Sequence, residues 1–213
     1  MMVSFQGQEG DFIITIVIQV LGVFLFFLVA VIAGKWLRAD PCEKITAQTG
    51  RITGLLYYLG LFFPFVLGFF WPGLDRFDGI LNINPLPFPP VALLTGLSFL
   101  ILGYYLVYAS IKSLRKRGKG APAFNLTKQL VERDIYSYTR NPMSLGYYLA
   151  CAGFSLVANS TYLTLYTFLL AFPAHVFYLK YYEEKELETR FGNAYLQYKQ
   201  TVPFLIPRFN GQK

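Results

Sequence analysis

The sequence predicts an all-α integral membrane protein with five transmembrane helices. We expect the last two to form a hairpin and a C-terminal amphipathic helix to follow at the membrane surface. Hydrophobic residues make up 54% of the 213 residues, charged residues only 15%, and the mean hydropathy is +0.42. Such a composition is typical of membrane proteins. Basic residues are concentrated in the segments that follow the first and third apolar runs. We expect one membrane domain over 1–213, in which 1–117 form scaffold helices and 118–213 the functional half.

Each predicted span is an apolar run close to the 20 or so residues that cross a bilayer. In chain order the spans are Phe12–Trp36, Ile52–Trp71, Val91–Ile111, Pro142–Ala158 and Thr161–Tyr182. Pro64 and Pro173 lie inside spans, where neighbouring groups can satisfy the freed carbonyls. The first run is too long for the apolar region of a signal peptide and lacks a basic segment before it, so we expect no cleavage.

Basic residues predict the orientation, because cytoplasmic loops are enriched in Lys and Arg. With the N-terminus outside and the C-terminus in the cytoplasm, 18 of the 19 basic residues face the cytoplasm. The membrane would be the inner or plasma membrane of a bacterium, or the endoplasmic reticulum of a eukaryote. The basic cluster at 112–119 follows a span directly, which is typical of contact with anionic membrane lipid. It is too short to indicate nucleic-acid binding.

The fourth predicted span begins at a helix-start signal, Asn141-Pro142. Asn is a good N-cap, because its side chain can accept a hydrogen bond from a free backbone amide, and Pro suits the first helical position. The positive end of the helix dipole attracts a carboxylate, and Arg140 adds a cation beside it. The alternative is an ordinary capped helix whose Arg reaches to the interface.

Small residues at helical spacing, Gly146, Ala150 and Gly153, predict close packing of this span on a neighbouring helix. A tight turn at 158–160 would join it to the last span. There, His175 is the only histidine, and it is typical of a polar contact between helices more than of a base or ligand. No metal site is expected, because no second His or Cys lies at ligand spacing.

Glu183 and Glu184 end the last span. Adjacent helical residues point about 100° apart, so the two carboxylates should not act as one close pair. Glu183 follows His175 by two helical turns and shares its face. Glu184 instead leads into a stripe that predicts a helix lying on the membrane, formed by Leu187, Phe191, Tyr195 and Tyr198. The alternative is a solvated run of charges.

These motifs together resemble the isoprenylcysteine carboxyl methyltransferase superfamily, whose relatives include the phospholipid methyltransferases. The resemblance covers about the last ninety residues, and the combination of motifs is more specific than any one of them. It rests on Leu130-Val131, Tyr136, Arg140-Asn141-Pro142, Glu183-Glu184, Phe191-Gly192, Tyr195, Tyr198 and Val202-Pro203, with a preceding glycine–proline loop at Lys119–Pro122.

The resemblance implies S-adenosylmethionine as cofactor, bound at the cytoplasmic membrane face, and isoprenylcysteine carboxyl O-methylation as activity. The implied acceptor is a lipophilic or lipid-attached molecule that enters from the membrane lipid. Arg140 and Glu184 would lie close to this acceptor as catalytic residues. The implied cofactor-binding residues are Gln129, Leu130, Val131, Tyr136, Asn141, Pro142, Met143, Ser144 and Glu183.

Elementary chemistry is compatible with these roles. The helix start at Pro142 suits a carboxylate, Glu183 suits an ammonium group or ribose hydroxyls, and Tyr136 suits a sulfonium cation. Three residues depart from the family pattern. Asn141 replaces a histidine of eukaryotic members, and Ser144 replaces an aromatic residue. Asp134 replaces a glycine that turns the chain, and we expect it in the left-handed conformation, which Asp tolerates.

Other functions fit the sequence as well. A phospholipid N-methyltransferase would need Glu184 or His175 to deprotonate its amine. A sterol- or enone-type reductase would use NADPH, and its last helices look similar. A non-catalytic scaffold would keep the fold alone. The sequence identifies neither the methyl acceptor nor the oligomeric state.

Overall fold

The computed structural model describes residues 3–62, 66, 76–118 and 127–207, which are mostly helical and contain no strand. Short π-helical segments interrupt the helices at Tyr57–Phe62, Tyr166–Ala171 and Leu179–Glu183, and a 3₁₀ turn spans Asp134–Ser137. The α-helices are α1 (Val3–Ala39), α2 (Glu43–Leu56), α4 (Arg76–Ile80), α5 (Pro89–Arg117), α6 (Pro142–Val157), α7 (Thr161–Leu165), α8 (Phe172–Tyr178), α9 (Glu184–Phe191) and α10 (Asn193–Thr201).

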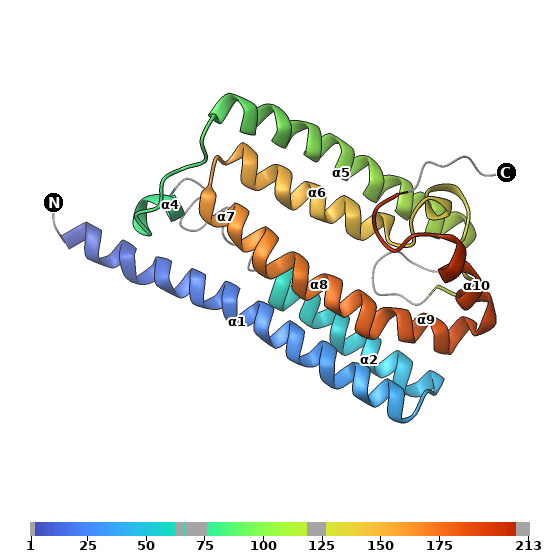
Figure 1. The fold of residues 1–213 in the computed structure, drawn as a ribbon. Coiled ribbons are helices and arrows are strands. Elements are labelled where there is room, and N and C mark those ends of the chain that lie inside the picture. The colour runs from blue at the N-terminus through green and yellow to red at the C-terminus, as the bar shows by residue number, and fades with distance from the viewer. Residues whose placement is uncertain (1–2, 63–65, 67–75, 119–126, 208–213) are drawn as a thin grey trace.

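The long helices lie side by side and alternate in direction (Figure 1). α1, α5 and the continuous rod of α7, α8 and α9 run one way, whereas α2 and α6 run the other way. The C-terminal ends of α5 and α9 therefore meet the N-terminal end of α6, and α10 folds against that end of the bundle. We call this the C-terminal end of the bundle, and it carries the functional residues described below.

Three helices are long and apolar enough to cross a membrane over the described residues: Ile13–Ala39, Pro89–Arg117 and Thr161–Phe191. They contain most or all of the first, third and fifth predicted spans. The fourth corresponds to the apolar but shorter α6. The second, Ile52–Trp71, is helical up to Phe62, and most of the remainder lies outside the described residues. Large apolar side chains face outward on these helices, including Phe24 (59% exposed) and Ile101 (73%), as an integral membrane protein requires.

The predicted small-residue face of α6 packs on α5 through two pairs of glycines. A Cβ atom on Gly146 would lie 2.8 Å from the Gly103 carbonyl oxygen, and one on Gly153 would lie 2.7 Å from the Gly96 carbonyl oxygen. Only glycine allows the two backbones to approach so closely. This prediction is confirmed, and the contact holds α6 closely against α5.

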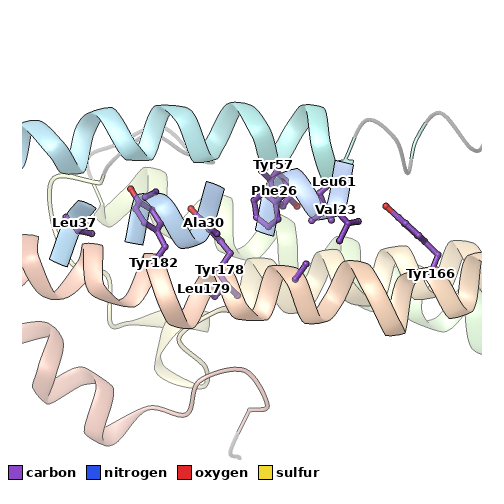
Figure 2. Packing of buried hydrophobic residues seen from close by; sticks show 12 residues of the cluster. Val23, Phe26, Ala30, Leu37, Tyr57, Leu61, Tyr166, Tyr178, Leu179 and Tyr182 are labelled. Carbon is purple, nitrogen blue, oxygen red and sulfur yellow. The ribbon is translucent and has the colours of Figure 1, made fainter. Parts of the chain in front are cut away.

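An aromatic core joins α1, the end of α2 and the last rod (Figure 2). Phe26 of α1 lies between the rings of Tyr57 and Tyr178, with centroids 6.0 and 5.3 Å away. Tyr182 is 1% exposed, and its hydroxyl lies 2.8 Å from the Thr49 hydroxyl. The phenolic oxygen thus has a partner inside the apolar core, as buried tyrosines generally require.

At the opposite end of the bundle, Asp78 of α4 caps the start of α7. Its carboxylate accepts hydrogen bonds from the backbone amides of Thr161 (2.7 Å) and Tyr162 (2.8 Å) and from the Ser160 hydroxyl (3.2 Å). The side chain is buried, and its charge lies at the positive end of the helix. The chain enters α7 through Asn159, whose φ is +52°.

The prediction of one continuous surface helix after Glu184 is wrong, because two helices occupy this segment. The last rod continues to Phe191, the chain breaks at Gly192, where φ is +53°, and α10 begins at Asn193. The break divides the predicted stripe. Tyr195 (2% exposed) and Tyr198 (4%) are buried inside the protein and do not line a lipid-facing surface.

Candidate functional site

A cavity of about 210 Å³ opens at the C-terminal end of the bundle. Its described lining comes from α2, α5, the loop before α6, the start of α6, the last rod and α10. It includes the predicted residues Leu130, Val131, Tyr136, Arg140, Asn141, Met143, Ser144 and Glu183. The structure thus brings the Arg140-Asn141 turn and Glu183 into one cavity.

Three predicted site residues do not line this cavity. Gln129 donates its backbone amide to the Gly118 carbonyl (3.3 Å) and helps to close the loop. Pro142 is buried at the first position of α6 and sets its start. Glu184 points to the other side of the rod, into a second cavity. The different directions of Glu183 and Glu184 were predicted from the helical repeat.

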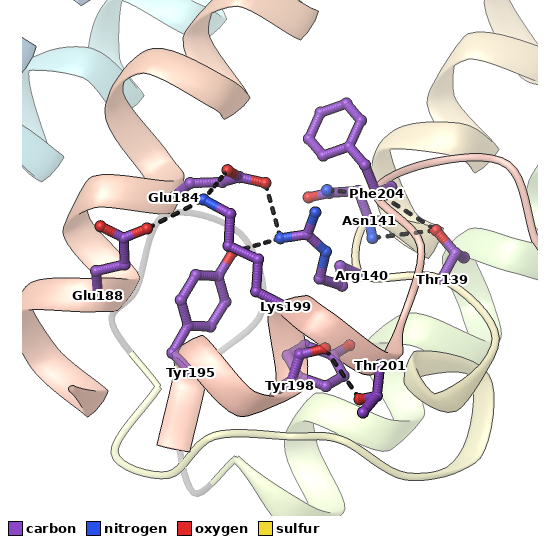
Figure 3. Close-up of polar contacts among 10 residues, drawn as sticks. All are labelled: Thr139, Arg140, Asn141, Glu184, Glu188, Tyr195, Tyr198, Lys199, Thr201 and Phe204. Atoms are coloured by element: carbon purple, nitrogen blue, oxygen red, sulfur yellow. Dashed lines mark hydrogen bonds and ion pairs between the residues drawn. The ribbon is translucent and has the colours of Figure 1, made fainter. Parts of the chain in front are cut away.

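Asn141 does not cap α6 as predicted, because its side chain makes no capping hydrogen bond. Its amide nitrogen instead donates to the Phe204 carbonyl at 2.9 Å (Figure 3). Beside it, the Thr139 hydroxyl donates to the Leu205 carbonyl at 2.9 Å, and the backbone amide of Arg140 donates to the Pro203 carbonyl at 2.9 Å. These three bonds hold the C-terminal segment against the start of α6. Because the Asn141 side chain makes one of them, it is not available to cap the helix.

Arg140 is enclosed between α10, the last rod and the C-terminal segment. Its Nη1 atom lies 2.8 Å from Glu184 Oε1, and its side chain is only 8% exposed (Figure 3). Nη1 also lies 3.4 Å from the Tyr195 hydroxyl, and the Phe204 ring lies 5.7 Å from the guanidinium carbon. The Nε atom is buried without a hydrogen-bond partner within the described part of the chain. A buried donor of this kind normally binds something polar.

Tyr136 and Asp134 are positioned by a short 3₁₀ turn. Asp134 has φ of +59°, so the predicted left-handed conformation is confirmed. Its carboxylate accepts hydrogen bonds from Arg117 (2.7 and 3.1 Å) and Ser113 (3.1 Å), and the Arg117 contact holds the pKa of Asp134 below its usual range. Burial, reinforced by the Glu183 carboxylate, raises the pKa of Tyr136, so it stays neutral at physiological pH. The Tyr136 carbonyl accepts from the Tyr198 hydroxyl at 2.6 Å.

His175 lines the same cavity two turns before Glu183, as their shared helical face predicts. Its Nδ1 atom lies 2.9 Å from the Tyr148 hydroxyl of α6, and the Tyr57 ring lies 5.0 Å away. The predicted polar contact between helices is therefore confirmed. The histidine lies in an aromatic part of the cavity, among the rings of Tyr57, Tyr148 and Tyr178.

Sequence reasoning missed one pair that lines the cavity, Glu186 and Arg190. They form an ion pair at 2.7 Å, and Arg190 also donates to the Thr127 carbonyl, which ties the loop before α6 to the last rod. The four-residue spacing was a signal for the ion pair. Nothing local in the sequence indicated the partner at Thr127.

The cavity combines groups that suit a ligand with a carboxylate, with positively charged groups and with an aromatic ring. Glu183 provides a carboxylate, the start of α6 and Arg140 provide positive charge, and Tyr136 provides an aromatic face. Leu130, Val131 and Met143 add apolar surface. S-adenosylmethionine has this chemistry, so the residues present fit the implied cofactor.

Comparison with known families shows a similarity over the C-terminal half of the described helices. Residues 91–194 match the sequence model of the family described as phospholipid methyltransferase. Comparisons with curated proteins and with solved structures gave no match. The matched segment runs from α5 to the first turn of α10 and includes the Arg140 turn and Glu183, two of the motifs that carry the resemblance. Over residues 91–194 the chain is thus similar to the phospholipid methyltransferases, a family that is part of the membrane methyltransferase superfamily that also contains the isoprenylcysteine carboxyl methyltransferases.

Proposed function

We propose that the protein transfers a methyl group from S-adenosylmethionine to a lipophilic or lipid-attached acceptor at the membrane surface. The observation that carries this proposal is the cavity in which the Arg140-Asn141 turn meets Glu183. Glu183 lies in the C-terminal part of a helix long enough to cross a membrane, Thr161–Phe191, and the turn directly precedes the shorter apolar helix α6. A water-soluble cofactor and a lipid can reach such a place from opposite sides.

Each group in the cavity has a role in holding the cofactor. Glu183 would bind the ammonium group or ribose hydroxyls, and the amides at the start of α6 would bind the carboxylate. Tyr136 would lie against the cation, an attraction worth about 0.5–2 kcal/mol. When bound, the cofactor supplies an electrophilic methyl group. The protein contributes alignment, since holding reactants in line accounts for much of the acceleration of such displacements.

Arg140 and Glu184 are the proposed acceptor-side residues. Arg140 would orient an anionic acceptor, and Glu184 holds Arg140 through the 2.8 Å ion pair. A carboxylate acceptor, as in isoprenylcysteine O-methylation, is already deprotonated and needs no base. An amine acceptor must lose a proton, and the groups available are Glu184 and His175. This second candidate, phospholipid N-methylation, is compatible with the match to the phospholipid methyltransferase family.

The proposed topology has five spans, with α6 and the last rod as the final pair. The C-terminal end of the bundle faces the cytoplasm, because the predicted orientation places 18 of 19 basic residues there. Single-cysteine labelling tests it. With Cys42 and Cys151 replaced, a cysteine at Gln197 should react only from the cytoplasmic side.

A methyl-transfer assay tests the function. Purified protein would be incubated with methyl-labelled S-adenosylmethionine and extracted membrane lipids, and the product identified by mass spectrometry. We expect labelled lipid from the wild type and from the exposed control Glu132→Gln, and a loss of more than about tenfold for Glu183→Gln, as when a charge contact is removed. Binding of NADPH without S-adenosylmethionine would support a reductase. Absence of both would support a scaffold.

A further inference from the structure

A second cavity, of about 370 Å³, lies on the other side of the last rod from the first. Its described lining is entirely charged, with four basic and two acidic side chains, and positive charge is in excess. We call these residues the basic cluster: Arg38, Lys180, Lys185 and Lys199, with Glu184 and Glu188. Nothing in the proposed methyl-transfer chemistry accounts for this excess.

The two carboxylates are already neutralised on one side of the cluster. Lys199 Nζ lies 2.6 Å from Glu184 Oε2 and 3.0 Å from Glu188 Oε1 (Figure 3). Glu184 Oε1 lies 2.8 Å from Arg140. Lys185 reaches Glu188 only at 3.9 Å. Over the described residues, neither Arg38 nor Lys180 has a carboxylate within 4.0 Å.

Arg38 and Lys180 are nevertheless held in place. Arg38 donates to the Gly34 carbonyl (2.9 Å) and to the Tyr181 carbonyl (2.7 Å), and its guanidinium lies 4.0 Å from the centre of the Tyr181 ring. No hydrogen bond from its remaining N–H groups is found over the described residues. Lys180 Nζ lies 4.9 Å from the centre of the Phe204 ring. Two cations are thus arranged beforehand, so a ligand pays little entropy to order them.

The ligand that suits two such cations is a phosphate. A guanidinium can donate two parallel hydrogen bonds to phosphate oxygens, and an ammonium adds a point charge. Arg38 lies in the last turn of a helix able to cross a membrane, and Lys180 lies in the C-terminal part of another. Basic groups where spans leave the membrane meet lipid head groups. A lipid phosphate is therefore favoured over a free one.

The cluster also adjoins the first cavity. Glu184 joins Lys199 of the cluster to Arg140 of the first cavity, and Phe204 contacts both Lys180 and Arg140. A head group whose phosphate binds Arg38 and Lys180 would extend towards Arg140.

We propose that the basic cluster binds the phosphate of a lipid head group and so positions a phosphate-bearing acceptor beside Arg140. That this lipid is the acceptor rests on the proposed function. The binding site itself rests only on the arrangement of Arg38 and Lys180.

Binding measurements on the purified full-length protein in detergent test the proposal. The probes are a short-chain diacylglycerol phosphate, the same diacylglycerol without phosphate, and inorganic phosphate. The variants are Lys180→Gln and Arg38→Gln, and the control is Lys44→Gln, an exposed lysine outside the cluster. S-adenosylmethionine binding by each preparation reports folding and tests the proposed function separately.

We expect the lipid phosphate to bind and the diacylglycerol to bind at least about tenfold more weakly. Lys180→Gln and Arg38→Gln should each lower the affinity for the lipid phosphate about fivefold, and the Lys44→Gln control should leave that affinity unchanged. Equal binding of both lipids, or unchanged affinity in both variants, would overturn the site. Inorganic phosphate binding as tightly as the lipid would overturn the lipid assignment. If the lipid phosphate binds and S-adenosylmethionine does not, the phosphate site is supported and the proposed function is refuted. If S-adenosylmethionine binds and the lipid phosphate does not, only the phosphate site is refuted.

Discussion

The close approach of α5 and α6 makes Gly146→Ala a sensitive test of how the site is built. A Cβ atom there would lie 2.8 Å from the Gly103 carbonyl oxygen, 2.9 Å from Val107 Cγ2 and 3.0 Å from the Val107 amide nitrogen, whereas ordinary contact begins at 3.4 Å. Two of these atoms belong to the backbone, so no side-chain rotation can make room. α6 has to move away from α5.

The expected change in the free energy of unfolding of Gly146→Ala follows from two opposing effects. Overpacking of this kind costs about 1–3 kcal/mol. Alanine is favoured over glycine inside a helix by about 1 kcal/mol. The free energy of unfolding should therefore fall by up to about 2 kcal/mol. Since α6 begins with Asn141, Met143 and Ser144 around the cavity, S-adenosylmethionine affinity should fall as well.

The assay is denaturant unfolding of the purified protein in detergent, followed by titration with S-adenosylmethionine. Gly79→Ala is the matched control, because a Cβ atom on Gly79 of α4 meets nothing within 4 Å. We expect that control to leave stability unchanged or slightly raised. If Gly146→Ala and Gly79→Ala behave alike, the backbone contact is not what positions α6.

Three further predictions concern the surroundings of the site. Asp78→Asn should lower the free energy of unfolding by about 1.5–3 kcal/mol, because one of the two amides at the start of α7 loses its charged acceptor; unchanged chemical denaturation would contradict the cap. Asn141→Leu should cost about 1 kcal/mol through the lost hydrogen bond to Phe204, and limited proteolysis should then cut the C-terminal segment faster than in the wild type. Burial raises the pKa values of Tyr136, Tyr195 and Tyr198, so stability should hold below the ordinary tyrosine pKa of about 10 and fall as pH rises beyond it, as the unfolded chain ionises first. Melting temperatures from pH 8 to 11 measure this fall, which should be shallower in Tyr198→Phe.

Local patterns predicted the helices and the directions of several side chains. The Asn141-Pro142 pair marked the start of α6, and the small residues Gly146 and Gly153 marked its packing face. Helical spacing separated Glu183 from Glu184 and placed Glu183 with His175. These features depend on residues within a few turns of one another, which a sequence displays directly.

The remaining features depend on partners distant in sequence. From its local sequence Asn141 is an ordinary capping residue, but its side chain instead donates to the Phe204 carbonyl, sixty-three positions later in the chain. Gly192 was recognised as a motif, but its positive φ, which turns α10 back onto Arg140, depends on the tertiary contacts of Tyr195 and Tyr198. The pairing of Asp78 in α4 with the start of α7 likewise joins two helices that no local pattern connects.

The most direct test of the central claim is equilibrium binding of S-adenosylmethionine to the purified wild type, Glu183→Gln and Glu132→Gln. The two variants remove one carboxylate each, from the cavity and from an exposed position near the same end of the bundle. We predict binding to the wild type and Glu132→Gln, and an affinity at least about tenfold weaker for Glu183→Gln. Equal affinity of all three proteins, or no binding by the wild type, would contradict the assignment of this cavity.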